Sequence, residues 1–246
     1  MKNIFSHKQI DNRKTAAYSI YRLLIPNSFT VKEKSKIHTV ANRQLLSLQK
    51  NFKIELYKLI QDNNPIKIKQ VFNKYYHKVF QLGLNASGLK LAYLYPILKN
   101  ENTLTVADKE WLSKSIEVEI NYFNNFLNQI RTRKLKKYSI DQRIDFYVKT
   151  LESQYDAGRI VGSPQHSFIY WKTNANEQCK ICSYLAALSP LPKELAITTP
   201  KASLSPCKIF CNCSLYIKSV SYDLYRERLQ QLSSKKELLL NLQHIV

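Results

Sequence analysis

Residues 37–60 read IHTVANRQLLSLQKNFKIELYKLI, and this stretch decides the fold class. Its apolar side chains recur at steps of three or four, apart from two adjacent pairs: Ile37, Val40, Ala41, Leu45, Leu48, Phe52, Leu56, Leu59 and Ile60. That spacing places the apolar side chains on one face of an α-helix and leaves polar side chains on the other. The stretch therefore predicts a long amphipathic helix in a mainly α protein.

Helical spacing of apolar residues continues on both sides of this stretch. It predicts further helices over residues 7–24, 65–82, 105–130, 140–157 and 222–242. Gly83 and Gly88 are expected to mark a loop, because glycine interrupts helices. Gly158 is expected to cap the C-terminus of the helix that precedes it.

Helical periodicity stops over residues 159–219, where five of the eight prolines and all five cysteines fall. We therefore divide the chain into three parts. Residues 1–158 are expected to form a helical body, residues 159–219 a small α+β module resembling a zinc ribbon, and residues 220–246 a C-terminal helix. The apolar side chains of that last helix either dock on a partner or fold back on the helical body.

The composition excludes several classes of protein. Only 4 of the 246 residues are glycine, which argues against Gly-rich phosphate loops, β-propellers and collagen-like chains. A hydrophobic fraction of 44% with 11% aromatic residues excludes wholesale disorder. No window approaches the roughly 18 uninterrupted apolar residues of a membrane span, and residues 1–14 lack the apolar core of a signal peptide. We expect a soluble, intracellular protein.

The chain is strongly basic, with 38 Lys and Arg against 18 Asp and Glu and a formal net charge of +20. Such a charge attracts polyanions, including nucleic acid, although a lysine-rich coat for solubility is the alternative interpretation. The densest basic stretch contains the candidate nucleic-acid-binding residues Arg131, Arg133, Lys134, Lys136 and Lys137. Cations there also complement the dipole at a helix C-terminus, so both interpretations stay open.

A second basic stripe lies on the helix expected over residues 65–82. Its lysines alternate with aromatic residues: Lys67, Lys69, Lys74, Tyr75, Tyr76 and Lys78. Lysines would contact phosphates without reading bases, so DNA binding would be independent of sequence. The alternative is an ordinary amphipathic helix with its aromatic side in the core.

The five cysteines are clustered, and none occurs before residue 179. They are Cys179, Cys182, Cys207, Cys211 and Cys213, in the pattern C-x₂-C, a gap of 24 residues, then C-x₃-C-x-C. Two thiolates separated by two residues can bind one metal ion, and a second pair completes a tetrahedron. Zinc suits an all-thiolate site, so we expect a structural zinc ion.

Five thiols exceed the four positions of a closed zinc site. Cys179 and Cys182 are the more secure pair of ligands, and two of the other three cysteines would complete the site. His166 is an outside candidate that is more simply interpreted as exposed. Disulfides, a redox C-x₂-C pair and buried inert thiols remain alternatives, although a reducing compartment disfavours disulfides and no βαβ setting supports a redox pair.

No pattern for catalysis emerges, so we expect no enzyme and name no catalytic residue. Glu117 and Glu119 lie two positions apart and therefore face different sides of a helix. Asp141, Asp145 and Glu152 are interpreted as surface charges.

Several short segments carry a resemblance to a known family. They are, in order, Thr150-Leu151-Glu152, Ala157-Gly158-Arg159, Tyr170-Trp171-Lys172-Thr173, Asn176-Glu177-Gln178-Cys179-Lys180-Ile181-Cys182 and Cys211-Asn212-Cys213-Ser214-Leu215. In this order, residues 140–220 resemble the phage head-morphogenesis family, the minor head proteins of the Mu F-like group. The chain departs from the family at Asn212, where arginine is usual, and at Cys207, where the family places a histidine one residue nearer the closing pair.

The resemblance implies a minor virion component that takes part in head assembly and in DNA packaging or delivery. Its partners would be portal or capsid proteins and DNA, and more than one copy could be present per particle. It would reside in the virion, and in the host cytoplasm during assembly. The alternative is a nucleic-acid-binding regulator whose zinc ribbon reads DNA sequence.

Overall fold

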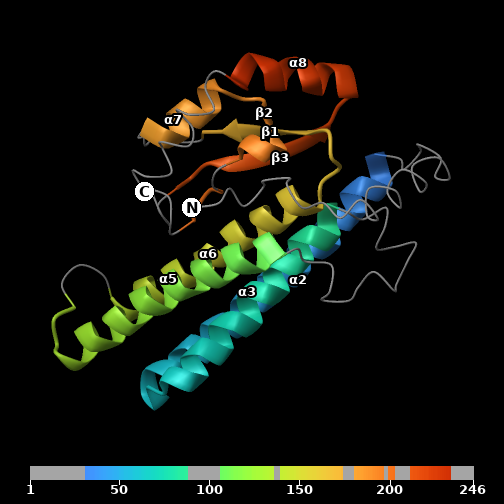
Figure 1. The fold of residues 1–246 in the computed structure, drawn as a ribbon. Coiled ribbons are helices and arrows are strands. Elements are labelled where there is room, and N and C mark those ends of the chain that lie inside the picture. The colour runs from blue at the N-terminus through green and yellow to red at the C-terminus, as the bar shows by residue number, and fades with distance from the viewer. Residues whose placement is uncertain are drawn as a thin grey trace.

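A computed structural model of the chain describes residues 31–87, 106–135, 139–173, 180–196, 199–202 and 211–233. Predictions that fall elsewhere, such as the helix over residues 7–24, lie outside the described residues. Within the described ranges the chain forms six α-helices and a small three-stranded sheet. The prediction of a mainly helical fold is therefore confirmed (Figure 1). None of the helices in these ranges combines the length and apolar character needed to cross a membrane.

Four long helices form the body of the molecule. They are α2 (Val31–Asp62), α3 (Pro65–Ser87), α5 (Val106–Arg131) and α6 (Ile140–Gly162). Each runs in the direction opposite to the one before it, so that α3 and α6 lie parallel (Figure 1). The link from α2 to α3 takes only two residues. Asn63 adopts a left-handed conformation there, and the Asn64 side chain accepts hydrogen bonds from the backbone N–H groups of Ile66 and Lys67.

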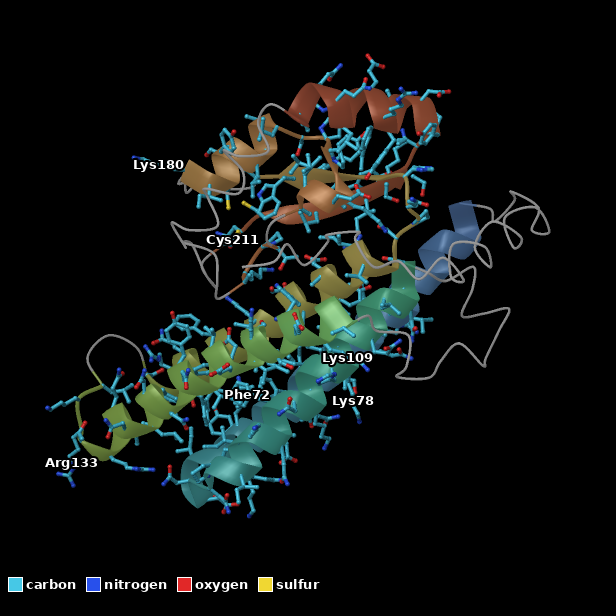
Figure 2. The ribbon with its side chains drawn as sticks, in the orientation of Figure 1. Phe72, Lys78, Lys109, Arg133, Lys180 and Cys211 are labelled. Carbon is cyan, nitrogen blue, oxygen red and sulfur yellow. The ribbon has the colours of Figure 1, made fainter. Side chains whose placement is uncertain are left out.

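An aromatic cluster fills the centre of the bundle. Phe72 of α3, labelled in Figure 2, contacts Phe52 of α2 and Phe123 of α5, with ring centroids 5.3 and 5.4 Å apart. Phe123 in turn contacts Tyr147 of α6 at 5.3 Å. These rings are buried or nearly so. Phe52 belongs to the periodic apolar face of residues 37–60, so the pattern in the sequence corresponds to the observed core.

Glycines bring α3 and α6 into close contact, which corrects two expectations. Gly83 is a residue of α3 rather than the start of a loop, and Gly158 is a residue of α6 rather than its cap. A Cβ atom at Gly83 would lie 2.0 Å from the backbone oxygen of Tyr155, and one at Gly158 would lie 2.1 Å from that of Phe80. The glycines therefore serve helix–helix packing, and α6 continues to Gly162 with Ser163 as its C-cap.

A small sheet follows the bundle in the chain. Its strands are β1 (Ser167–Lys172), β2 (Leu191–Pro192) and β3 (Ser214–Ser219), with β1 in the centre and antiparallel to both neighbours. Helix α7 (Lys180–Ala187) and a short 3₁₀ turn, η3 (Lys193–Leu195), lie between β1 and β3 in sequence. Sheet and helices share a second apolar core that includes Ile160 from the end of α6.

Helix α8 (Tyr222–Ser233) packs against the sheet, as Figure 1 shows. The ring of Tyr225 stacks on Phe168 of β1 with centroids 5.6 Å apart. The Arg228 guanidinium donates hydrogen bonds to the backbone oxygens of Leu188 and Pro190. The described part of the C-terminal helix thus folds onto the cysteine-containing region; the apolar residues after Ser233 lie outside the described ranges.

Candidate metal centre

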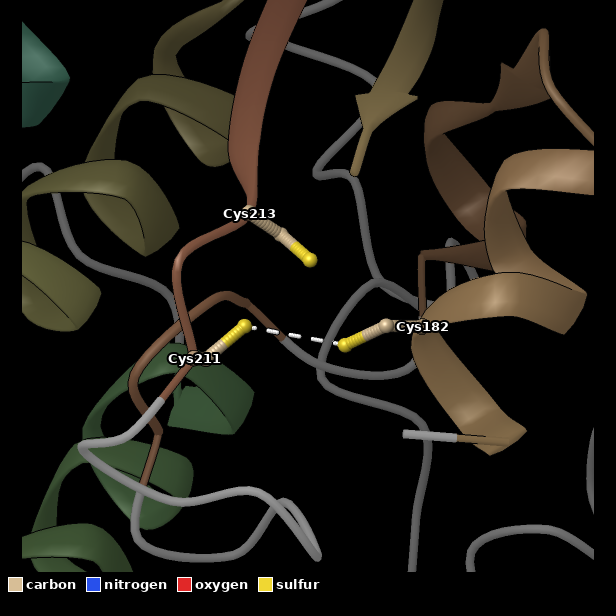
Figure 3. Close-up of side chains that lie close together, drawn as sticks. All are labelled: Cys182, Cys211 and Cys213. Atoms are coloured by element: carbon tan, nitrogen blue, oxygen red, sulfur yellow. Dashed lines mark hydrogen bonds between the residues drawn. The ribbon is translucent and has the colours of Figure 1, made fainter. Parts of the chain in front are cut away.

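Three cysteines from two distant segments meet in the second core. Cys182 is the third residue of α7, whereas Cys211 and Cys213 lie in the segment that leads into β3. Their side chains point toward a common centre (Figure 3). All three sulfur atoms lie within 4.8 Å of one another, and the Sγ atoms of Cys182 and Cys211 are 3.6 Å apart.

Pairing between β1 and β3 positions the second segment. Trp171 pairs with Leu215 and Lys172 with Ser214, which brings Cys213 to the end of the sheet beside α7. The C-terminal end of α7 is held near β1, because the Ser189 hydroxyl accepts a hydrogen bond from the Trp171 backbone N–H and donates one to the Leu185 oxygen. The two cysteine segments therefore converge through backbone pairing and not through the thiols alone.

The centre is withdrawn from solvent. Cys182 and Cys211 are each 3% exposed and Cys213 is 7% exposed. Burial raises the pKa of the Cys213 thiol, because a thiolate is poorly solvated there. Cys211 raises this pKa as well, whereas Cys182 and Trp171 lower it. A bound cation would reverse this balance, since it stabilises thiolates directly.

The geometry suits metal ligation better than a disulfide. None of these three thiols forms a disulfide, since the 3.6 Å between the Sγ atoms of Cys182 and Cys211 is well beyond the roughly 2.05 Å of an S–S bond. Two thiolates on one tetrahedral zinc ion lie about 3.8 Å apart, as follows from a Zn–S distance of about 2.3 Å. Three buried cysteines so close together could hold a metal ion.

The other predicted ligands divide into two groups. Cys179 and Cys207 lie outside the described residues. His166 lies away from the thiols, with its ring 5.1 Å from that of Tyr222 and 5.4 Å from that of Tyr225 in α8. The imidazole is partly covered rather than exposed, because α8 packs over it.

The predicted basic stretch lies at the end of the bundle remote from the cysteines, where Figure 2 labels Arg133. Arg131, Arg133 and Lys134 are exposed, whereas Lys136 and Lys137 lie outside the described residues. Arg133 adopts a left-handed backbone with φ of 53°. The N–H groups of Arg133 and Lys134 donate to the backbone oxygens of Ile130 and Gln129, which is the pattern that usually ends a helix with glycine.

The carboxylates interpreted as surface charges pair with side chains of other segments. Asp145 accepts a hydrogen bond from the Lys53 ammonium group at 2.6 Å, and Asp141 accepts one from the Tyr57 hydroxyl at 2.6 Å. Glu152 pairs with Lys201. Glu117 is exposed and Glu119 is 2% exposed, so the expectation that these two face different sides of the helix is confirmed.

One residue beside the cysteines received no role from the sequence. Trp171 is 5% exposed, and its indole N–H has no hydrogen-bond partner of ordinary geometry. Trp171 lies directly before the cysteine segments, within a stretch that resembles a family motif. That position was the feature of the sequence that could have pointed to it.

No family model matches the chain. Neither a curated protein nor a solved structure matches it significantly.

Proposed function

We propose that residues 159–219 form a module held together by a structural zinc ion, in a phage minor head protein that contacts DNA without sequence preference. The observation that carries this proposal is the convergence of Cys182 with Cys211 and Cys213, from segments about 30 residues apart, in one buried cluster. Strand pairing with β1 holds the segment of Cys211 and Cys213, and coordination shared with Cys182 of α7 would link the two segments and so add directly to folding.

The ligand set would consist of four thiolates. Cys182, Cys211 and Cys213 supply three, and we assign the fourth to Cys179 from its C-x₂-C spacing with Cys182. Cys207 is then the thiol left over. A closed and buried four-thiolate set is typical of structural zinc, whereas catalytic zinc keeps one position open to water.

The virion assignment rests on the order of the family-like segments. Two of them fall on α6, where Thr150 accepts or donates a hydrogen bond with Tyr76 and Gly158 contacts α3. The next begins at Tyr170 in β1, and the last runs from Cys211 into β3. This order of helix, strand, cysteine pair and closing cysteine segment supports a place among head-morphogenesis proteins.

Two exposed basic surfaces support contact with DNA. One is the bundle end with Arg131, Arg133 and Lys134. The other is α3, which carries four exposed lysines and no acidic residue, with Lys78 labelled in Figure 2. Tyr75 and Tyr76 of α3 are buried in the core, so they are not available to stack on bases. Contacts through cations alone would bind phosphates without reading sequence.

Zinc content is the first test. Protein purified without chelators should contain one zinc ion per chain by elemental mass spectrometry, and removal of zinc should unfold the module. A chain with no bound transition metal would contradict the proposed centre.

Two further measurements test the proposed role. Mass spectrometry of purified phage particles should detect the chain, and its absence from particles would refute the virion assignment. Two unrelated DNA duplexes should compete equally at fixed salt. A marked preference for one duplex would instead favour a sequence-reading regulator.

A further inference from the structure

We infer that the indole N–H of Trp171 donates a hydrogen bond to the Cys213 sulfur when the centre holds its metal ion, and so positions that ligand. The inference rests on the metal centre proposed above and adds a residue that is not itself a ligand.

The register of the sheet places the two side chains on one face. Trp171 of β1 lies opposite Leu215 of β3, and Cys213 is two residues before Leu215. Side chains alternate along a strand, so Cys213 and Leu215 fall on the side of the sheet that carries Trp171. Diagonal neighbours of this kind lie about 7–8 Å apart at their backbones, which is within reach of an aromatic side chain.

The buried indole N–H of Trp171 lacks a hydrogen-bond acceptor. Trp171 is 5% exposed, its Nε1 atom is shielded from solvent, and it has no hydrogen-bond partner of ordinary geometry. Buried tryptophan N–H groups usually find a hydrogen-bond partner, because burying an unsatisfied donor destabilises the fold. Trp171 and Cys213 belong to the same apolar cluster.

A metal-bound thiolate would supply that acceptor. Charged acceptors form stronger hydrogen bonds than neutral ones. Donors around a metal centre orient its ligands, and their loss typically weakens metal binding 10–100-fold.

Paired tryptophan variants test the inference, because the chain has only two tryptophans. Trp171→Phe removes the N–H and keeps an aromatic ring. Trp111→Phe is the matched control, since Trp111 of α5 lies in neither cysteine segment: its ring packs 6.0 Å from that of Phe80 and also borders the second core, so this variant shows the effect of losing an indole there without removing the N–H of Trp171. Chelator competition should show zinc binding about tenfold weaker in Trp171→Phe and unchanged in Trp111→Phe. Equal zinc affinities in both variants would overturn the inference but would not contradict the metal centre.

A second measurement leaves Trp171 in place and so does not depend on how Trp171→Phe folds. In the Trp111→Phe protein a single indole N–H resonance remains for NMR spectroscopy. Zinc should move this resonance downfield, and ¹¹³Cd in place of zinc should show scalar coupling to the indole proton through the sulfur. An unmoved resonance upon stoichiometric zinc binding would refute the hydrogen bond. Failure of the unmutated protein to bind either metal would refute the centre itself, and the inference with it.

Discussion

Gly158 of α6 lies directly against the backbone of Phe80 in α3, so close that a Cβ atom at Gly158 would be 2.1 Å from the Phe80 carbonyl oxygen. Gly83 of α3 makes the reciprocal approach to the Tyr155 carbonyl oxygen. The two parallel helices therefore meet through backbone atoms, and each glycine is the only residue that fits its position.

Gly158→Ala should destabilise the bundle by about 3 kcal/mol, because overpacking in a core typically costs about 1–3 kcal/mol and backbone atoms yield less than side chains. The sign of the change in stability distinguishes a crowded position from an open one. At an uncrowded helix position, replacing glycine with alanine stabilises a protein by about 0.5–1 kcal/mol. Urea unfolding followed by circular dichroism measures the difference, and a stabilised variant would contradict the observed helix contact.

Arg133→Gly should stabilise the protein by about 1 kcal/mol, because Arg133 adopts the left-handed conformation that glycine accepts without strain. The same variant should bind DNA more weakly, since it removes an exposed cation.

Arg131→Gly is the matched control for this variant. It removes the same charge from the last residue of α5, where glycine should cost up to about 1 kcal/mol. Equal losses of DNA affinity with opposite changes in stability are expected. Unchanged DNA binding in both variants would assign these cations to the helix dipole alone.

Much of the fold was predictable because local pattern and global packing agree. The apolar spacing of residues 37–60 predicted α2, and Phe52 from that pattern lies in the aromatic core. The cysteine spacing predicted that two segments would converge, and Cys182 does meet Cys211 and Cys213. In each case residues close in sequence carried the information.

The glycines could not be interpreted correctly from the sequence. The sequence predicts a loop at Gly83 and a helix C-cap at Gly158, because glycine disfavours helix interiors when only neighbours in sequence are considered. Their role depends on contact with residues 72 and 78 positions away, Tyr155 and Phe80, which no local pattern reveals. The same reasoning applies to Asp145, whose partner Lys53 lies 92 residues away.

The cysteines should fall into two groups when each is replaced by serine, which keeps the side-chain size. Cys182→Ser, Cys211→Ser and Cys213→Ser should each weaken zinc binding by more than the 10–100-fold effect typical of residues around a ligand shell. Cys179→Ser should behave in the same way if it supplies the fourth thiolate.

Cys207→Ser is the matched control among the cysteines and should keep one zinc ion per chain with unchanged affinity. Chelator competition on all five variants decides the ligand set. A loss of zinc in Cys207→Ser with full binding in Cys179→Ser would exchange their assigned roles.

Asp156 should make stability depend on pH in the acid range. Burial raises the pKa of this carboxyl above its ordinary value of 3.8, although the Arg159 guanidinium lies 2.9 Å away and acts in the opposite direction. A carboxyl with a higher pKa in the folded state binds its proton more tightly there. Its contribution to stability is therefore fully present below the unfolded pKa and is lost as pH rises through the folded pKa.

Asp156→Asn removes this titration while keeping the side-chain shape. The free energy of unfolding of the unmutated protein, relative to that of Asp156→Asn, should fall as pH rises above about 4 and then level off. Urea unfolding of both proteins over a pH series measures this difference. Release of zinc in acid is common to both proteins and cancels in the comparison. A difference that rises with pH would show that the pairing with Arg159 outweighs the burial of the carboxylate.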